Sequence, residues 1–285
     1  MKIVYVSMGE KYILKKLIEA GFDVAGVAEP QKGISDGRRN TIRAIKKVII
    51  EDLSTVSRRH KIPFLSFSRE QYALFENFLL EKKPELVVVY SMPFLIRRST
   101  LETVGAKFVN IHPSYLPNYR GPNPWVYQFL DHPGKIGYTI HFIDPGEDTG
   151  DILFQEYITV GVKNFEKIYR EFIKASSNNL LRILKELNDG KTMNVVHQPR
   201  ESPTKRANRV SDAWSLIDFS SIDAERLYVF LRNAKSWIPR LNGYSVIHFR
   251  KADHTYEPGY IKNHKIFMNI YTKDGYVRLI KKIPH

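Results

Sequence analysis

The sequence predicts an α/β fold: a mostly parallel, Rossmann-like sheet with helices on both faces, followed by a smaller β-rich C-terminal domain. Two observations lead to this prediction. Apolar runs of strand length alternate with helical patterns through most of the chain. The last part instead holds short apolar runs separated by turn signals, a pattern typical of antiparallel strands.

The first residues give the clearest strand–helix–strand pattern. Residues 2–7 (KIVYVS) are rich in β-branched and aromatic side chains, which favours a strand. Residues 10–20 carry apolar side chains at helical spacing and end at Gly21, a residue suited to a helix C-terminus. Residues 22–28 then predict a second strand. This β-α-β start predicts parallel pairing.

The same alternation continues along the chain. We expect a strand at 63–67, a helix at 70–82 and a strand at 85–90, whose run ELVVVY is typical of a strand buried on both faces. Further strands are expected at 107–110, 137–143 and 152–159. A long amphipathic helix is expected at 164–187, ending at Asp189–Gly190.

A change of composition follows. Residues 199–213 are polar, basic and nearly free of large apolar side chains, so we interpret them as a linker. The predicted domains are therefore 1–198, with the chemistry, and 214–285. In the second, we expect a helix at 223–233 and strands at 244–249, 259–262, 266–271 and 276–280.

Composition limits the possible chemistry. The chain has no cysteine, which excludes disulfides, thiolate catalysis and cysteine-ligated zinc. Its net charge of +14 fits either a solvated basic surface or an anionic partner such as nucleic acid, a nucleotide-linked substrate or folate. No apolar run reaches the roughly 18 residues of a membrane span, and the first residues lack the pattern of a signal peptide. We therefore expect a cytoplasmic protein with no membrane partner.

The loop after the strand at 107–110 is the candidate for chemistry, because ligands of open parallel sheets bind at the carboxyl ends of the strands. The first strand is followed by SMGEKY, which lacks the glycine spacing of a dinucleotide site. Asn110 and His112 are two residues apart on an extended backbone, so their side chains face the same way. Downstream, an acidic loop carries Asp144, Glu147 and Asp148, a pattern that alone is typical of a solvated turn.

These two loops together resemble the folate-dependent formyltransferase family. The matching residues are Asn110-Ile-His112-Pro-Ser114-Tyr-Leu116-Pro117, with Asp148-Thr-Gly150 at the family's spacing, and also Gly137-x-Thr139-x-His141. The family includes glycinamide ribonucleotide transformylase, methionyl-tRNA formyltransferase and sugar-nucleotide N-formyltransferases.

The resemblance implies an N-formyltransferase with 10-formyltetrahydrofolate as co-substrate, no metal, and Asn110, His112 and Asp148 as catalytic residues. Asn110 would stabilise the oxyanion, His112 would share that role or carry a proton, and Asp148 would orient His112 and a water. It implies folate contacts from Met92, Leu95, Ile140, Ile143, Asp144, Gly146 and Glu147. It also implies acceptor contacts from Ser114, Tyr119, Arg120, Asn123 and Trp125. A binding module without activity is the alternative, which the intact catalytic trio disfavours.

Two acceptors remain open. The Arg120–Trp125 sequence is similar to that of sugar N-formyltransferases, which favours a nucleotide-linked amino sugar, a role in lipopolysaccharide or O-antigen biosynthesis, and a homodimer. The residues after 209 resemble the C-terminal barrel of methionyl-tRNA formyltransferase, which keeps tRNA as the alternative. The basic segment 37–47 fits a tRNA contact, but we interpret it as the solvated face of a helix because it lacks interleaved aromatics.

Overall fold

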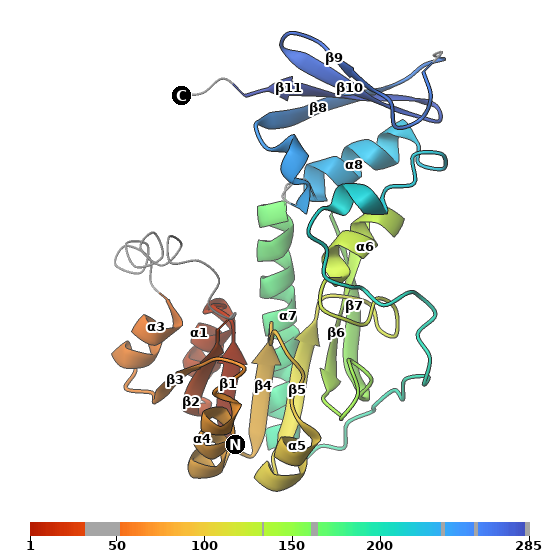
Figure 1. Ribbon diagram of the computed structural model, residues 1–285. Coiled ribbons are helices and arrows are strands. Elements are labelled where there is room, and N and C mark those ends of the chain that lie inside the picture. The colour runs from red at the N-terminus through yellow and green to blue at the C-terminus, as the bar shows by residue number, and fades with distance from the viewer. Residues whose placement is uncertain (32–51, 133, 161–164, 235–236, 254–255, 283–285) are drawn as a thin grey trace.

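The computed structural model describes residues 1–31, 52–132, 134–160, 165–234, 237–253 and 256–282. The basic segment 37–47 lies outside these residues. Most of the described chain belongs to two sheets with helices packed around them (Figure 1). Among the described helices, none is both long and apolar enough to cross a membrane.

The larger sheet has seven strands in the order β3-β2-β1-β4-β5-β6-β7. The first five are parallel, and β6 and β7 are antiparallel to their neighbours. The mostly parallel sheet is thus confirmed. Its strands are β1 (Lys2–Ser7), β2 (Asp23–Pro30), β3 (Phe64–Phe67), β4 (Leu86–Tyr90), β5 (Lys107–His112), β6 (Lys135–Phe142) and β7 (Ile152–Thr159).

Each face of this sheet carries its own apolar cluster. Under one face, side chains of α4 (Tyr72–Lys82) pack on β1, β3 and β4, with α5 (Arg98–Val104) alongside. The other face is covered by α1 (Tyr12–Glu19), α3 (Leu53–Arg59), α6 (Pro124–Asp131) and the long α7 (Phe165–Asn188). The helices predicted at 10–20, 70–82 and 164–187 are therefore present, and Gly21 follows α1 with a positive φ of 78°.

Among the described residues, the structure contains three short α-helices that the sequence analysis did not predict. They are α3, α5 and α6, each seven or eight residues long. Helices of this length show little periodicity and depend on local signals. Asp52, for example, caps α3 by accepting a hydrogen bond from the Thr55 amide at 2.9 Å.

The C-terminal part contains a four-stranded antiparallel sheet in the order β8-β11-β10-β9, packed on α8 (Ala224–Ala234). Its strands are β8 (Tyr244–Lys251), β9 (Ile261–Asn263), β10 (Phe267–Thr272) and β11 (Gly275–Lys281), and two 3₁₀ turns, η1 (Ala213–Leu216) and η3 (Pro239–Leu241), precede the sheet. The predicted β-rich C-terminal part is thus confirmed. Buried side chains of α8 join the cluster formed by α6 and α7, so the two parts share a continuous core.

Candidate active site

Strand β5 delivers Asn110 and His112 to the sheet's carboxyl edge. Both side chains lie on the face of Phe108, while the intervening Ile111 is buried in the cluster on the opposite face. The antiparallel neighbour β6 places His141 opposite Asn110 and Thr139 opposite His112. Two imidazoles and one amide therefore converge where β5 ends.

Asp148 reaches this cluster from the loop after β6. Its Oδ1 lies 3.4 Å from Nδ1 of His112 and 3.8 Å from Nε2 of His141. Its Oδ2 accepts a hydrogen bond from the Gly121 amide at 2.9 Å. The structure thus brings together the three residues that the sequence analysis singled out as catalytic, although two come from strand β5 and one from the loop after β6.

His141 completes the cluster and was not predicted as a site residue. Its imidazole is 1% exposed, and burial lowers its pKa to about 4 despite the opposing effect of the Asp148 charge. Its Nδ1 lies 2.7 Å from the carbonyl oxygen of Phe142, to which it donates. The neutral ring therefore presents Nε2 as an acceptor to Nδ2 of Asn110, 3.2 Å away. The available sequence signal was its two-residue spacing from Thr139.

Both ring nitrogens of His112 face oxygen acceptors. Nδ1 faces Asp148, and Nε2 lies 3.3 Å from the carbonyl oxygen of Tyr119. The side chain is 6% exposed and that of Asp148 is 16% exposed, so the carboxylate retains a path to solvent. An imidazolium at this position would donate to both acceptors.

The predicted acceptor residues have hydrogen bonds within the protein, and their contact with an acceptor stays a prediction. Ser114 donates to the Asn118 carbonyl at 2.7 Å, and the Tyr119 hydroxyl donates to Asp131 at 2.7 Å. Hydroxyl groups in tight loops readily satisfy nearby backbone or side-chain acceptors. Each hydroxyl is used as a donor here and keeps its lone pairs as acceptors for a substrate.

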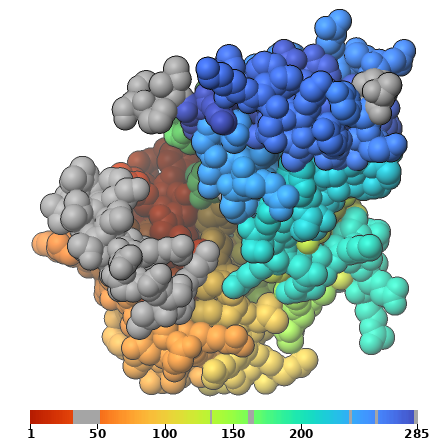
Figure 2. Space-filling view, turned by 45° about the horizontal axis from the view of Figure 1, so that its top comes forward, coloured from red at the N-terminus to blue at the C-terminus, as the bar shows by residue number. Residues whose placement is uncertain are grey.

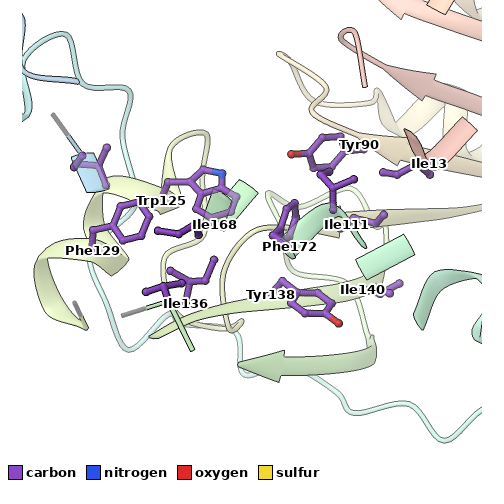
Figure 3. Packing of buried hydrophobic residues seen from close by; sticks show 14 of the residues in the cluster. Ile13, Tyr90, Ile111, Trp125, Phe129, Ile136, Tyr138, Ile140, Ile168 and Phe172 are labelled. Atoms are coloured by element: carbon purple, nitrogen blue, oxygen red, sulfur yellow. The ribbon is translucent and has the colours of Figure 1, made fainter. Parts of the chain in front are cut away.

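Arg120 and Trp125 also have contacts within the protein. The Arg120 side chain donates to the carbonyls of Pro199 and Arg200, and burial lowers its pKa. Trp125 is 8% exposed and packs edge-on against Phe172 (Figure 3). It packs in the same way against Phe165. Helix α6 is amphipathic, and Trp125, near its N-terminus, lies on the face that packs in the core. Asn123, half-buried just before α6, stays a predicted contact.

The predicted folate residues fall into two groups. Ile140 is fully buried beside Tyr138 and Ile111 on the face opposite Asn110, because side chains alternate along β6 (Figure 3). The side chain of Ile140 is thus part of the core, and only its backbone is left for the predicted folate contact. Met92 and Ile143 are partly buried on the face of Asn110, and Leu95 is 57% exposed.

The remaining predicted folate residues form the loop 144–147. Asp144 accepts from the Gly146 amide at 3.0 Å and from the Thr149 hydroxyl at 2.6 Å, which closes the turn. Glu147 binds Arg206 through both carboxylate oxygens. These contacts shape the loop that carries Asp148, so the acidic sequence forms a structured turn at the surface. Among the described residues, no group of three His, Asp or Glu side chains is placed to hold a metal ion.

Residues 199–213 are not a free connection. Gln198 and the following residues contact both loops of the site, and Ala207 is fully buried. In the space-filling view, this cyan segment runs along the yellow-green part of the chain (Figure 2). Polar side chains of this segment, such as Ser202 and Thr204, form hydrogen bonds with backbone groups of the loop after β5. The boundaries of the two domains stay a prediction.

Comparison with known proteins supports the same chemistry. The family model described as "Formyl transferase" matches residues 39–184. Methionyl-tRNA formyltransferase of Syntrophomonas wolfei is 29% identical over 256 residues, covering 88% of this chain and 77% of that protein. The corresponding enzyme of Thermotoga maritima is 29% identical over 230 residues, covering 79% and 70%.

Solved structures share the fold at lower identity. An N-formyltransferase from Helicobacter canadensis, in complex with folinic acid and dTDP-3-aminofucose, superposes with a TM-score of 0.69 at 16% identity, covering 99% of this chain and 100% of that one. WlaRD, a sugar 3N-formyl transferase, gives a TM-score of 0.68 at 15% identity, covering 100% and 98%. Because the family model matches just over half of the sequence, including both loops of the site, the chain belongs to the formyl transferase family.

Proposed function

We propose that this protein transfers a formyl group from 10-formyltetrahydrofolate to the amine of a nucleotide-linked amino sugar. The observation that carries the proposal is the convergence of Asn110, His112 and Asp148 at the end of β5, with His141 behind Asn110. This cluster offers a hydrogen-bond donor for an oxyanion and a proton carrier beside a carboxylate, which formyl transfer to an amine requires.

The reaction follows from these positions. The acceptor nitrogen attacks the formyl carbon, and the carbonyl oxygen becomes an oxyanion as the carbon turns tetrahedral. One N–H of the Asn110 amide is directed at His141, which leaves the other N–H to donate to that oxyanion. A neutral, buried His141 is suited to this task. Its Nε2 accepts a hydrogen bond from the Asn110 amide nitrogen, and this bond fixes the orientation of the amide.

Proton transfer completes the step. The attacking amine loses a proton and the folate nitrogen gains one as the carbon–nitrogen bond to the carrier breaks. His112 with Asp148 is the pair in position to move this proton, directly or through water admitted beside the carboxylate. Folate would occupy the side of Met92 and Ile143, which share the face of Asn110, next to the 144–147 loop that follows Ile143.

The folate donor is supported by the two solved relatives whose complexes hold folinic acid or 5-N-formyl-tetrahydrofolate. Calorimetry with tetrahydrofolate tests it directly. We expect saturable binding that is retained after treatment with a metal chelator. The donor assignment fails if no binding occurs at millimolar folate or if chelation abolishes it.

The sugar acceptor is supported by the sugar formyltransferase structures, which align over essentially this whole chain and nearly all of their own. Methionyl-tRNA is the second candidate, because the methionyl-tRNA formyltransferases share 29% identity over most of this sequence. The side chains of Arg120 and Trp125 have contacts within the protein, so the sugar proposal does not depend on their touching the acceptor.

An acceptor panel separates the two candidates. The protein is incubated with 10-formyltetrahydrofolate and either nucleotide-linked amino sugars or methionyl-tRNA, and the released tetrahydrofolate is followed. We expect turnover with an amino sugar. Turnover confined to methionyl-tRNA would transfer the proposal to the second candidate.

A further inference from the structure

A segment from the C-terminal side binds the loop that follows β5. We call residues 198–207 the strap. Its Ser202 hydroxyl donates to the Pro117 carbonyl at 2.7 Å, and Thr204 Oγ1 accepts from the Tyr119 amide at 2.7 Å. The Ala207 amide donates to the Arg120 carbonyl at 2.8 Å. These contacts hold the strap against the loop whose backbone also reaches Asp148.

The side chain of Arg120 joins the loop to the strap. Its residue is only 6% exposed. One terminal nitrogen donates to the Arg200 carbonyl at 3.0 Å, and the other donates to the Pro199 carbonyl at 2.8 Å and to Gln198 Oε1 at 2.9 Å. A planar guanidinium can serve three such acceptors in fixed directions, which a lysine ammonium cannot reproduce. Arg120 therefore fixes the orientation of the Gln198 amide.

Gln198 carries the connection onward to Asp148. Its Nε2 donates to the Asp148 carbonyl at 3.1 Å and to the Gly150 carbonyl at 2.6 Å. On the other side, the amide of Gly121, the neighbour of Arg120, donates to the Asp148 carboxylate. The contacts close a ring that runs from the Asp148 carboxylate through Gly121, Arg120 and Gln198 back to the Asp148 carbonyl.

Asp148 needs such support because of its backbone. Its φ is 55°, in the left-handed region that non-glycine residues adopt only at an energetic cost. Held there, its Oδ1 faces both His112 and His141.

We propose that Arg120 and Gln198 are positioning residues that hold the Asp148 carboxylate toward the two histidines. This inference rests on the proposed formyl transfer, in which Asp148 acts with His112. Misplacing a catalytic group by about 1 Å can lower turnover by about a hundredfold.

The test uses Gln198→Leu, which keeps the size of the side chain and removes its amide. We expect kcat to fall about tenfold or more, with both KM values within about threefold of wild type. The Gly121 amide, followed by hydrogen exchange, should exchange at least about tenfold faster, because its carboxylate acceptor is no longer fixed. Arg120→Lys should change both measurements in the same direction.

The matched control is Ser202→Ala. This variant removes one hydrogen bond between strap and loop, but Ser202 has no contact with Asp148 among the described hydrogen bonds. We expect kcat within about twofold of wild type, and unchanged exchange at Gly121, because only the loop contact is lost. Thermal unfolding of all three variants reports whether they are folded.

Two results would overturn the inference. One is wild-type kcat, or wild-type exchange at Gly121, in folded Gln198→Leu. The other is an equal loss in Ser202→Ala, which would assign the effect to general docking of the strap. If the wild-type protein transfers no formyl group, the proposed function fails, while exchange at Gly121 still decides whether Gln198 positions Asp148.

Discussion

The amide Nδ2 of Asn110 lies 3.2 Å from Nε2 of His141, directly across the antiparallel pair of β5 and β6. This contact orients the amide so that its donors, rather than its carbonyl oxygen, are presented where β5 ends. His141 thus sets the direction in which the Asn110 amide donates.

Replacement of His141 should therefore impair turnover without abolishing binding. We expect His141→Ala to lower kcat about 10- to 100-fold, the range found when a supporting contact of a functional residue is lost. Steady-state kinetics with both substrates would check this. Unchanged kcat in a folded variant would show that Asn110 needs no support from His141.

The catalytic trio should be more sensitive. Asn110→Ala, His112→Asn and Asp148→Ala should each lower turnover by about a hundredfold or more, because each removes a group that acts on developing charge or on the proton. Circular dichroism would verify the fold. Near-normal turnover in any one of the variants would remove that residue from the mechanism.

Stability should depend on pH through His141. Its folded-state pKa of about 4 lies below the ordinary value of 6.5, so the unfolded chain binds more protons between these values. The contribution of His141 to the free energy of unfolding should be fully present above pH 6.5. It should decline toward pH 4, by at most about 3 kcal/mol. Urea unfolding of wild type and His141→Gln between pH 7 and pH 4.5 would isolate the contribution. His60→Gln, at an exposed side chain, is the control.

Trp125 should matter for stability rather than for acceptor binding. Trp125→Ala should destabilise the fold by about 3–5 kcal/mol, the usual effect of deleting a large buried aromatic ring. Trp125→Phe, which keeps an aromatic ring beside Phe172, should leave the acceptor KM within about threefold. A large increase in that KM without loss of stability would return Trp125 to the acceptor site.

Salt dependence should distinguish a compact acceptor from tRNA. A tRNA held by several phosphate contacts would lose affinity by orders of magnitude between about 50 and 200 mM salt, whereas a diphosphate should give a shallow dependence. We predict the shallow case. Reversing the charges of Arg39 and Lys46, which lie outside the described residues, should then change activity less than about tenfold. The sugar assignment would be contradicted if the wild-type protein bound methionyl-tRNA with a strong salt dependence and the double variant no longer bound it.

The sequence by itself determined the sheet, its long helices and the position of the chemistry. Apolar runs and helical spacing are local properties, so 2–7, 85–90 and 164–187 could be assigned without knowing their neighbours. Asn110 and His112 could be placed on one face for the same reason, because alternation along a strand is fixed by backbone geometry.

Only the tertiary structure decided which polar residues serve the site and which serve the fold. Arg120 lies in the loop that follows His112, yet its side chain binds the strap. Gln198 is remote from Asp148 in sequence, and no local pattern marks it. The physical reason is that a polar side chain acquires its role from the partners that burial leaves within hydrogen-bonding distance, and long-range packing chooses those partners.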